Sequence, residues 1–130
     1  MTIVTIPQTL EVALAAITPA IDTQVRGVEY KPVVGTPYQI VDFLFARPDN
    51  RYLERYYDQS GYMQVTLMYP KMIGAAAMRT RAQLIRSTFK SGSILSGVKI
   101  SATPEVGAED EDGDRIMVPV IVRFFKHIQE

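Results

Sequence analysis

The sequence has no cysteine and a single histidine, and both scarcities exclude kinds of chemistry. Without cysteine there are no disulfides, no thiol catalysis and no zinc-finger ligand sets. A Ser–His–Asp site needs a histidine beside its nucleophile, but His127 lies near the C-terminus, in what we predict to be a polar, mobile tail. The glycines are too scattered to cradle a phosphate. We therefore expect no catalytic residue and no enzymatic activity.

The chain also lacks an excess of charge of either sign. Its 14 basic and 14 acidic residues give a formal net charge of zero, which argues against a protein built as a whole to hold nucleic acid. A neutral protein has little self-repulsion to keep its copies apart. The charge balance therefore favours association.

Long apolar runs are missing as well. No segment approaches the ~20 apolar residues that a membrane helix needs, and residues 1–7 have neither the basic nor the apolar region of a signal peptide. We expect assembly in the cytoplasm and no membrane partner. The 130 residues, 47% of them hydrophobic, are enough for one hydrophobic core, so we predict a single domain over residues 1–130.

The acidic run at residues 109–114 is a candidate for a calcium-binding loop. An EF-hand needs glycine at its sixth position and glutamate at its twelfth, whereas counting from Asp110 these positions hold Arg115 and Ile121. We interpret the run as a solvated hairpin turn. A subunit contact or weak divalent-ion contact through Asp110 and Asp112 is the alternative. We expect no metal site and no cofactor.

The first third of the chain predicts a short helix, an irregular segment and a strand. Apolar residues recur at helical spacing over residues 8–17, directly after Pro7, where a helix can begin. Residues 22–37 are rich in proline and glycine and indicate a loop or an irregular edge segment. Residues 38–45 are rich in β-branched and aromatic side chains and predict a strand. The predicted buried stripe of the helix is Leu10, Ala13, Leu14 and Ile17.

The remainder predicts a second helix among further strands. Alternating residues at 61–69 predict a strand that Pro70 closes. Residues 71–90 predict a helix whose buried stripe recurs at steps of three and four. Strands are then predicted at 97–103 and 115–125, the latter at an edge or with a bulge because of Pro119, and an acidic turn lies between them at 104–114. The buried stripe of the helix is Ala75, Met78, Ala82, Ile85 and Phe89.

These elements predict an α+β fold, with helices packed on one face of a mostly antiparallel sheet and a protruding hairpin arm. The arm is residues 47–60, a polar segment between two predicted strands. Tyrosine and arginine are enriched at protein interfaces, and we favour an interface over the alternative, an arm folded back on its own sheet. The candidate contact residues of the arm are Arg51, Tyr52, Arg55, Tyr56 and Tyr57.

Basic residues gather on one face of the second predicted helix. Arg79, Arg86 and Lys90 share this face, and residues 71–90 contain no acidic residue. Such a face binds DNA, pairs with a neighbouring subunit or is simply solvated. Because no aromatic residues are interleaved and the whole chain is neutral, we favour the subunit contact or the solvated face over direct DNA binding.

The sequence motifs of the second half, and the order in which they occur, resemble those of the phage tail terminator family. In that family a strand ending in Tyr-Pro leads into an alanine-rich helix, which ends near Phe-Lys-x-Gly and is followed by a Gly-Val strand, a turn and a final strand. The resemblance covers residues 8–125, and the tyrosine-rich arm departs from it. The matching segments are Gly35–Tyr38, Tyr62–Pro70, Gly74–Ala77, Phe89–Gly92, Gly97–Ile100 and Arg115–Val120.

The resemblance implies a structural role at the neck end of the virion tail. Tail terminators form a hexameric ring that caps the tail tube, stops its polymerisation and presents the other face to the neck proteins. The implied partners are copies of the same chain, the tail tube protein and the head–tail connector proteins. DNA would pass through the ring lumen without specific binding.

Three other functions stay open at the level of the sequence. The chain is alternatively another neck or tail-completion protein, a small DNA-binding phage protein, or an enzyme acting on phage DNA. The last is disfavoured because the acidic residues lie mostly in one turn, which is a poor scaffold for a metal site.

Overall fold

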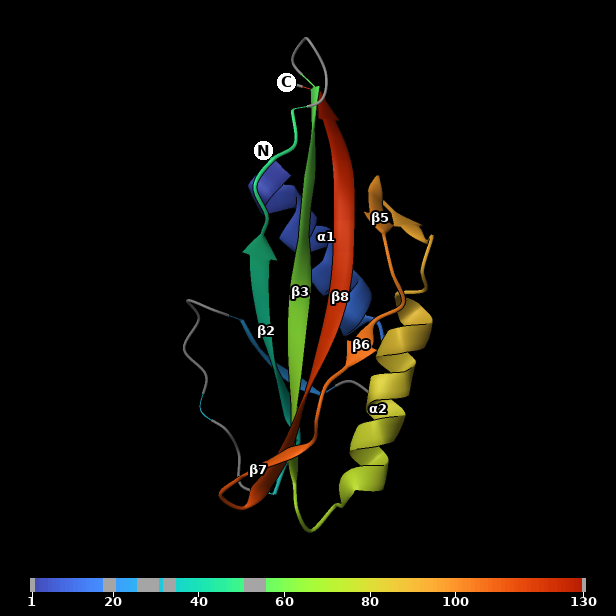
Figure 1. The fold of residues 1–130 in the computed structure, drawn as a ribbon. Coiled ribbons are helices and arrows are strands. Elements are labelled where there is room, and N and C mark those ends of the chain that lie inside the picture. The colour runs from blue at the N-terminus through green and yellow to red at the C-terminus, as the bar shows by residue number, and fades with distance from the viewer. Residues whose placement is uncertain (1, 18–20, 26–30, 32–34, 51–55, 130) are drawn as a thin grey trace.

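The computed structural model describes residues 2–17, 21–25, 31, 35–50 and 56–129. Within them the chain forms two helices and one sheet of eight strands (Figure 1). The strand order is β1-β2-β3-β8-β5-β4, and β6 and β7 also pair with β8. The elements are α1 (Thr2–Ala15), β1 (Asp22–Val25), β2 (Tyr38–Phe45), β3 (Tyr56–Pro70), α2 (Ala75–Thr88), β4 (Ile94–Leu95), β5 (Val98–Ile100), β6 (Glu105–Val106), β7 (Asp110–Asp112) and β8 (Arg115–Gln129).

Strands β3 and β8 form the long centre of the sheet. They are antiparallel over all 15 residues of each strand, and Figure 1 shows them curving together along the length of the molecule. The register sets Met63 opposite Val122 and Val65 opposite Val120, and all four side chains are buried. Such apolar cross-strand pairs stabilise a sheet, so these two strands supply one wall of the core.

Helix α1 is longer than the sequence predicted. It begins at Thr2 instead of Gln8 and therefore contains Pro7, which was expected directly before the helix. Pro7 is the sixth residue of α1. It removes the hydrogen bond that its N–H would donate four residues back, and its ring crowds that carbonyl, so it weakens the first turn of the helix. Leu10, Leu14 and Ile17 of the predicted stripe are buried, and Ala13 is partly buried and packs against the core.

Helix α2 lies within the predicted range and begins after Gly74, whose φ of 90° suits glycine better than other residues. Met78, Ala82 and Ile85 are buried as predicted, and Phe89 caps the helix with its N–H bonded to the Ile85 carbonyl at 3.0 Å. Residues from both helices and from β2, β3, β5 and β8 make one core cluster. Neither helix in the described residues is long and apolar enough to span a membrane.

Four short strands were not predicted. One is β4 at 94–95, which pairs with β5. β1 lies in the segment expected to be irregular and pairs in parallel with β2 at the sheet edge. β6 and β7 lie in the region expected to be only an acidic turn, and both pair with β8. Each is two to four residues long, too short to show an alternation of apolar and polar residues.

The expected edge position of Pro119 is wrong, because β8 has neighbours on both sides. Pro119 lies where β6 has ended and β7 has not begun, and its carbonyl accepts a hydrogen bond from Gly107 N at 2.8 Å. The N–H and C=O of a paired strand residue point the same way. The donor that proline lacks therefore faces the break between β6 and β7, where little pairing is lost.

The protruding arm is not confirmed, and its residues 56–60 are corrected. Residues 56–60 are not part of a polar loop: they extend β3 and pair with β8. The predicted arm residues Arg51, Tyr52 and Arg55 lie outside the described residues. The observed class is α+β with a mostly antiparallel, curled sheet and two helices.

Candidate functional site

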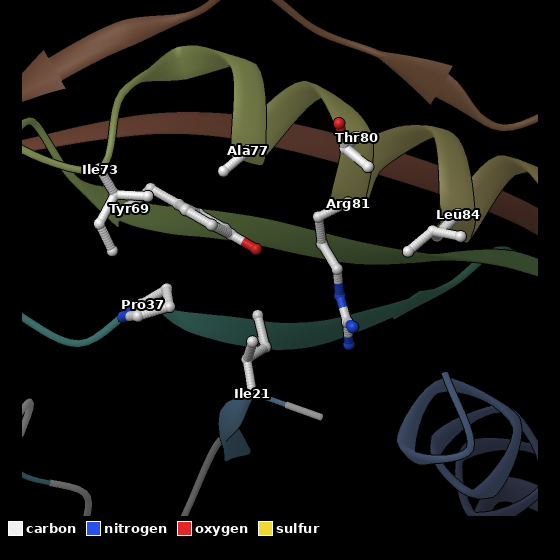
Figure 2. A pocket seen from close by; sticks show the side chains of 8 residues that line it. All are labelled: Ile21, Pro37, Tyr69, Ile73, Ala77, Thr80, Arg81 and Leu84. Atoms are coloured by element: carbon white, nitrogen blue, oxygen red, sulfur yellow. The ribbon is translucent and has the colours of Figure 1, made fainter. Parts of the chain in front are cut away.

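Helix α2 presents different chemistry on two sides, because side chains two positions apart on a helix do not face each other. Arg79 turns toward the segment that carries β6 and β7, where it lines a depression with Val106 and Glu109. Arg81 turns toward the start of β1 and β2, where it lines a cavity with Ile21 and Pro37 (Figure 2). The two sides correspond to opposite edges of the sheet.

Arg79 forms an ion pair within its own subunit. Its Nε donates to both carboxylate oxygens of Glu109 at 3.2 and 3.0 Å, and its Nη2 donates at 2.7 Å. This forked geometry favours both charged forms: the hydrogen bond raises the pKa of Arg79 and lowers the pKa of the Glu109 carboxyl. Arg79 therefore ties α2 to the segment before β7, a local role that the sequence did not predict.

The other two residues of the predicted basic face behave differently from each other. Arg86 is half-buried and donates from Nε to the carbonyl of Pro104 at 3.2 Å. Lys90 is exposed beyond the end of α2. Arg79 and Arg86 thus both bind the segment at 104–109, whereas Lys90 lies at the surface. Their role between subunits stays a prediction.

The acidic segment forms an exposed hairpin end on β8. β7 pairs Asp110 with Met117 and Asp112 with Arg115. Lys71 Nζ lies 3.2 Å from a carboxylate oxygen of Glu111. Asp110 and Asp112 are exposed, and neither takes part in an ion pair with another described residue. No group of three potential metal-binding side chains occurs in the described residues.

The base of the predicted arm is held by hydrogen bonds across 46–49 and 58–60. Ala46 N donates to the carbonyl of Ser60 at 2.9 Å, and Asp49 and Asp58 exchange two backbone bonds of 3.0 Å. The buried Gln59 side chain donates to the carbonyl of Ala46 at 2.8 Å. These bonds continue the β2–β3 hairpin beyond the end of β2.

The expectation that His127 lies in a mobile tail is wrong. His127 is paired with Asp58 in the ladder between β3 and β8, and its Nδ1 lies 2.8 Å from an Asp58 carboxylate oxygen. Among the tyrosines, Tyr56 and Tyr57 lie at the same end of β3, and the Tyr57 side chain is half-buried.

A cavity beside Arg81 was not found by sequence reasoning. It measures about 410 Å³ and is lined mainly by apolar side chains from α2, the end of β3 and the starts of β1 and β2. The Arg81 side chain points into it and is only 3% exposed (Figure 2). Burial lowers the pKa of Arg81 and raises the pKa of the Tyr69 hydroxyl on the cavity wall. We refer to this cavity as the Arg81 pocket.

The sequence contained a signal for this pocket. Ala77, Arg81 and Leu84 are spaced by four and three residues, so they share one helix face. On this face Arg81 lies between two apolar residues, Ala77 and Leu84. Such a pattern predicts a partly apolar surface next to the main buried stripe of the helix.

Comparisons with known proteins agree with the geometry. A solved structure with 17% sequence identity superposes with a TM-score of 0.73, covering 96% of this chain and 92% of the other, and this likeness shows the fold. Seven chains of solved structures match in all. No curated protein sequence matches.

The class of protein is therefore a small α+β domain of a known structural type. The sequence profile described as phage tail terminator protein matches residues 5–124, and the chain belongs to this family. The family is a structural family of phage tails, so the chain is a phage tail-completion protein and a component of the virion tail.

Proposed function

We propose that this protein is a tail terminator, which forms a ring on the end of the tail tube, stops tube polymerisation and provides the surface that joins the head. The observation that carries the proposal is the family match over residues 5–124. The agreement in fold along 96% of the chain supports it.

The proposed mechanism is surface matching without catalysis. One face of the ring copies the contact that a tube subunit makes, so it docks on the growing end. The other face does not accept another tube ring, which ends growth and leaves a surface for the head–tail connector proteins. A closed ring needs two different, complementary surfaces on each subunit.

The two sides of α2 supply surfaces of this kind. The Arg81 pocket lies toward the β1 and β2 edge, and the acidic β7 hairpin lies on the other flank of β8. We further propose that both helices pack on the core-facing side of the sheet. The arm, with its residues 56–60 forming part of β3, would then contact a neighbour through its tyrosines and arginines.

The proposed assembly is a homohexamer in the neck end of the tail, built in the host cytoplasm. DNA passes through its lumen without specific binding, which agrees with a formal net charge of zero. Ring size is measured by mass in solution and by electron microscopy of the purified protein. A chain that stays monomeric on tube ends would contradict the proposal.

The functional test is electron microscopy of phage particles that lack this gene. Without a cap nothing stops tube growth, so we expect overlong tails that are not joined to heads. Supplying the wild-type protein in trans restores normal tails. Tails of normal length already attached to heads in the deletion phage would overturn the assignment.

A further inference from the structure

We propose that a cavity beside Met72 receives the exposed face of the β4–β5 hairpin, residues 94–100, of a neighbouring copy of the same chain. In this contact Ile94 fills the cavity, and Lys99 pairs with the carboxylate of Asp114 on its rim. The inference rests on the proposed ring, because it names a contact that closes that ring. We refer to the two surfaces as the Met72 cavity and the Ile94 face.

The Met72 cavity lies at the turn between β3 and α2. It measures about 450 Å³, and the described residues that line it are Gly35, Pro70, Lys71, Met72 and Asp114. The turn is held by backbone bonds, since Lys71 N donates to the Asp114 carbonyl at 3.0 Å. Met72 is nevertheless 85% exposed. An exposed apolar side chain beside a concave surface is typical of an interaction site.

The rim of the cavity carries a negative charge for a partner. The charge of Lys71 is paired, because its Nζ lies 3.2 Å from a carboxylate oxygen of Glu111. Asp114 is exposed and takes part in no ion pair with another described residue. The cavity therefore suits an apolar side chain that stands next to a cation.

The β4–β5 hairpin presents this combination on one face. Ile94 is 67% exposed, whereas the adjacent Leu95 packs against the core. The register sets Ile94 opposite Lys99, and directly opposite side chains are neighbours on the same face of a strand pair. Lys99 is exposed, and its Nζ lies 5.7 Å from the centre of the Phe125 ring. Among the described residues it takes part in no ion pair.

The backbone of the hairpin is fixed before any contact forms. Its two turn residues, Ser96 and Gly97, have φ values of 47° and 83°, as the tightest hairpin turns require. At its base, Gly92 N donates to the Ile100 carbonyl at 2.8 Å, and Ile100 N donates to the Ser93 carbonyl at 2.9 Å. A surface that is already ordered loses little conformational entropy on binding.

Two other exposed apolar side chains show why Ile94 is the better ligand for the cavity. Leu44 lies opposite Tyr62, which carries no positive charge. Val106 lines a depression with Arg79, but the charge of Arg79 is paired with Glu109. Ile94 differs from both because a cation stands directly beside it and is available to a carboxylate.

The two surfaces lie at opposite ends of α2. The turn at 71–74 leads into the helix and the hairpin follows it, and the 14 residues between them span about 21 Å. Figure 1 shows β7 at the level of the start of α2 and β5 beyond its end. A subunit therefore cannot fill its own cavity with its own hairpin. Two different surfaces give a head-to-tail contact, and its repetition closes a ring when the rotation permits.

Other pairings fit the charges less well. The Arg81 pocket would place a guanidinium near Lys99, and like charges repel. A nucleic-acid phosphate would meet the carboxylate of Asp114 in the Met72 cavity. On the Ile94 face it would find one cation, whereas DNA binding relies on several. Charge complementarity therefore favours a second copy as the occupant.

The first experiment reverses the two charges of the contact. Lys99→Glu and Asp114→Lys each bring like charges together, so we expect each variant to associate at least about 30-fold more weakly than wild type in sedimentation. A chain with both substitutions has opposite charges again in every contact, and we expect it to regain most of the lost affinity. Roles within one subunit would give no recovery, because the two residues lie at opposite ends of α2.

The second experiment tests the apolar half of the contact. We expect Met72→Ser and Ile94→Ser each to weaken association at least about 10-fold, as truncation at the centre of an interface does. Mixing these two variants leaves one intact contact per pair, so dimers form but rings do not. The matched control is Val12→Ser on α1, which also removes an exposed apolar side chain and leaves association unchanged.

The melting temperature of each variant keeps folding apart from assembly. Every substituted side chain is exposed, so we expect the melting temperatures to stay close to the wild-type value. If the melting temperature fell in parallel with association for both halves of the contact, these side chains would act in folding and the inference would be overturned.

The outcomes distinguish this inference from the proposed function. Rings of wild-type affinity from all four single variants would overturn the contact and leave the terminator role intact. Normal rings that no longer bind the tube or connector proteins would make one of those proteins the occupant instead, and loss of DNA binding by Lys99→Glu with normal rings would point to nucleic acid. A wild-type chain that stays monomeric in solution and on tube ends would also overturn the contact. Tail lengths in the deletion phage decide the terminator role separately.

Discussion

At the scale of single residues, the ion pair between Arg79 and Glu109 explains a surface that the sequence leaves ambiguous. Spacing alone placed Arg79 on an exposed basic face, and that placement is correct, since 67% of its side chain is exposed. The partner could not be predicted, because Glu109 lies 30 residues away and reaches α2 only through the fold. Side-chain type and exposure can be predicted locally, whereas a partner across the fold depends on the tertiary structure.

The Arg79–Glu109 pair makes a prediction about pH. The folded pKa of Glu109 lies below its ordinary 4.5. The ion pair therefore stabilises the folded state above pH 4.5, and this stabilisation is lost as the pH falls through the folded pKa. We expect the protection factors for amide hydrogen exchange in residues 107–112, which correct for the intrinsic exchange rate at each pH, to fall on acidification below pH 4.5. Glu109→Gln should exchange fast already at neutral pH, and high salt should weaken the wild-type effect. Identical profiles for the two proteins would contradict this.

Gly61 is a second residue whose identity the structure explains. It lies between Phe45 on β2 and Phe124 on β8, whose rings contact edge to face at 5.9 Å. A Cβ at position 61 would lie 2.2 Å from the Leu44 carbonyl oxygen. We expect Gly61→Ala to lower the free energy of unfolding by about 1–3 kcal/mol, measured by chemical denaturation. The adjacent Ser60→Ala is the control, and equal stability of both variants would refute the account.

At the scale of elements, long amphipathic segments were predictable and short ones were not. β2 has the bounds that its composition predicts, Tyr38–Phe45, and α2 lies inside the predicted helix. β1, β6 and β7 depend on pairing with a neighbouring strand, which no local pattern shows. The extension of β3 to Tyr56 was missed because its residues are polar, although the pairing with β8 orders them.

Helix α1 allows a matched test of packing on one element. Leu14 is 1% exposed, whereas Val12 on the same helix is 71% exposed. We expect Leu14→Ala to cost about 2–5 kcal/mol of unfolding free energy, because it leaves a cavity in the core. Val12→Ala should change stability by less than about 0.5 kcal/mol. If thermal or chemical denaturation shows similar losses of stability for Leu14→Ala and Val12→Ala, α1 does not pack against the core through the face that carries Leu14.

At the scale of the whole molecule, the predicted arm gives a direct test of how the subunits assemble. We expect Tyr52→Ala with Tyr56→Ala to weaken ring formation by at least about 2 kcal/mol, the scale of an interface hot spot, without changing the melting temperature. Both quantities are measured on one preparation. A parallel loss of stability and assembly would mean that the rings pack within their own subunit.

The whole-molecule function could not be predicted from composition or from any single motif. Neutral charge, no cysteine and one histidine exclude much chemistry but select no partner. The family resemblance from Tyr62 to Val120 supplied the role, and the match over residues 5–124 confirms the family. The Arg81 pocket required the fold, because its walls come from segments far apart in the sequence.

The most direct test of the central claim is the length of tail tubes assembled from purified tube protein, with and without this chain. If the protein is a terminator, tubes stop growing after it is added, and electron micrographs show a ring on one end. The length then stays constant when more tube protein is supplied. Tubes that continue to elongate at the same rate, with bare ends, would contradict the account.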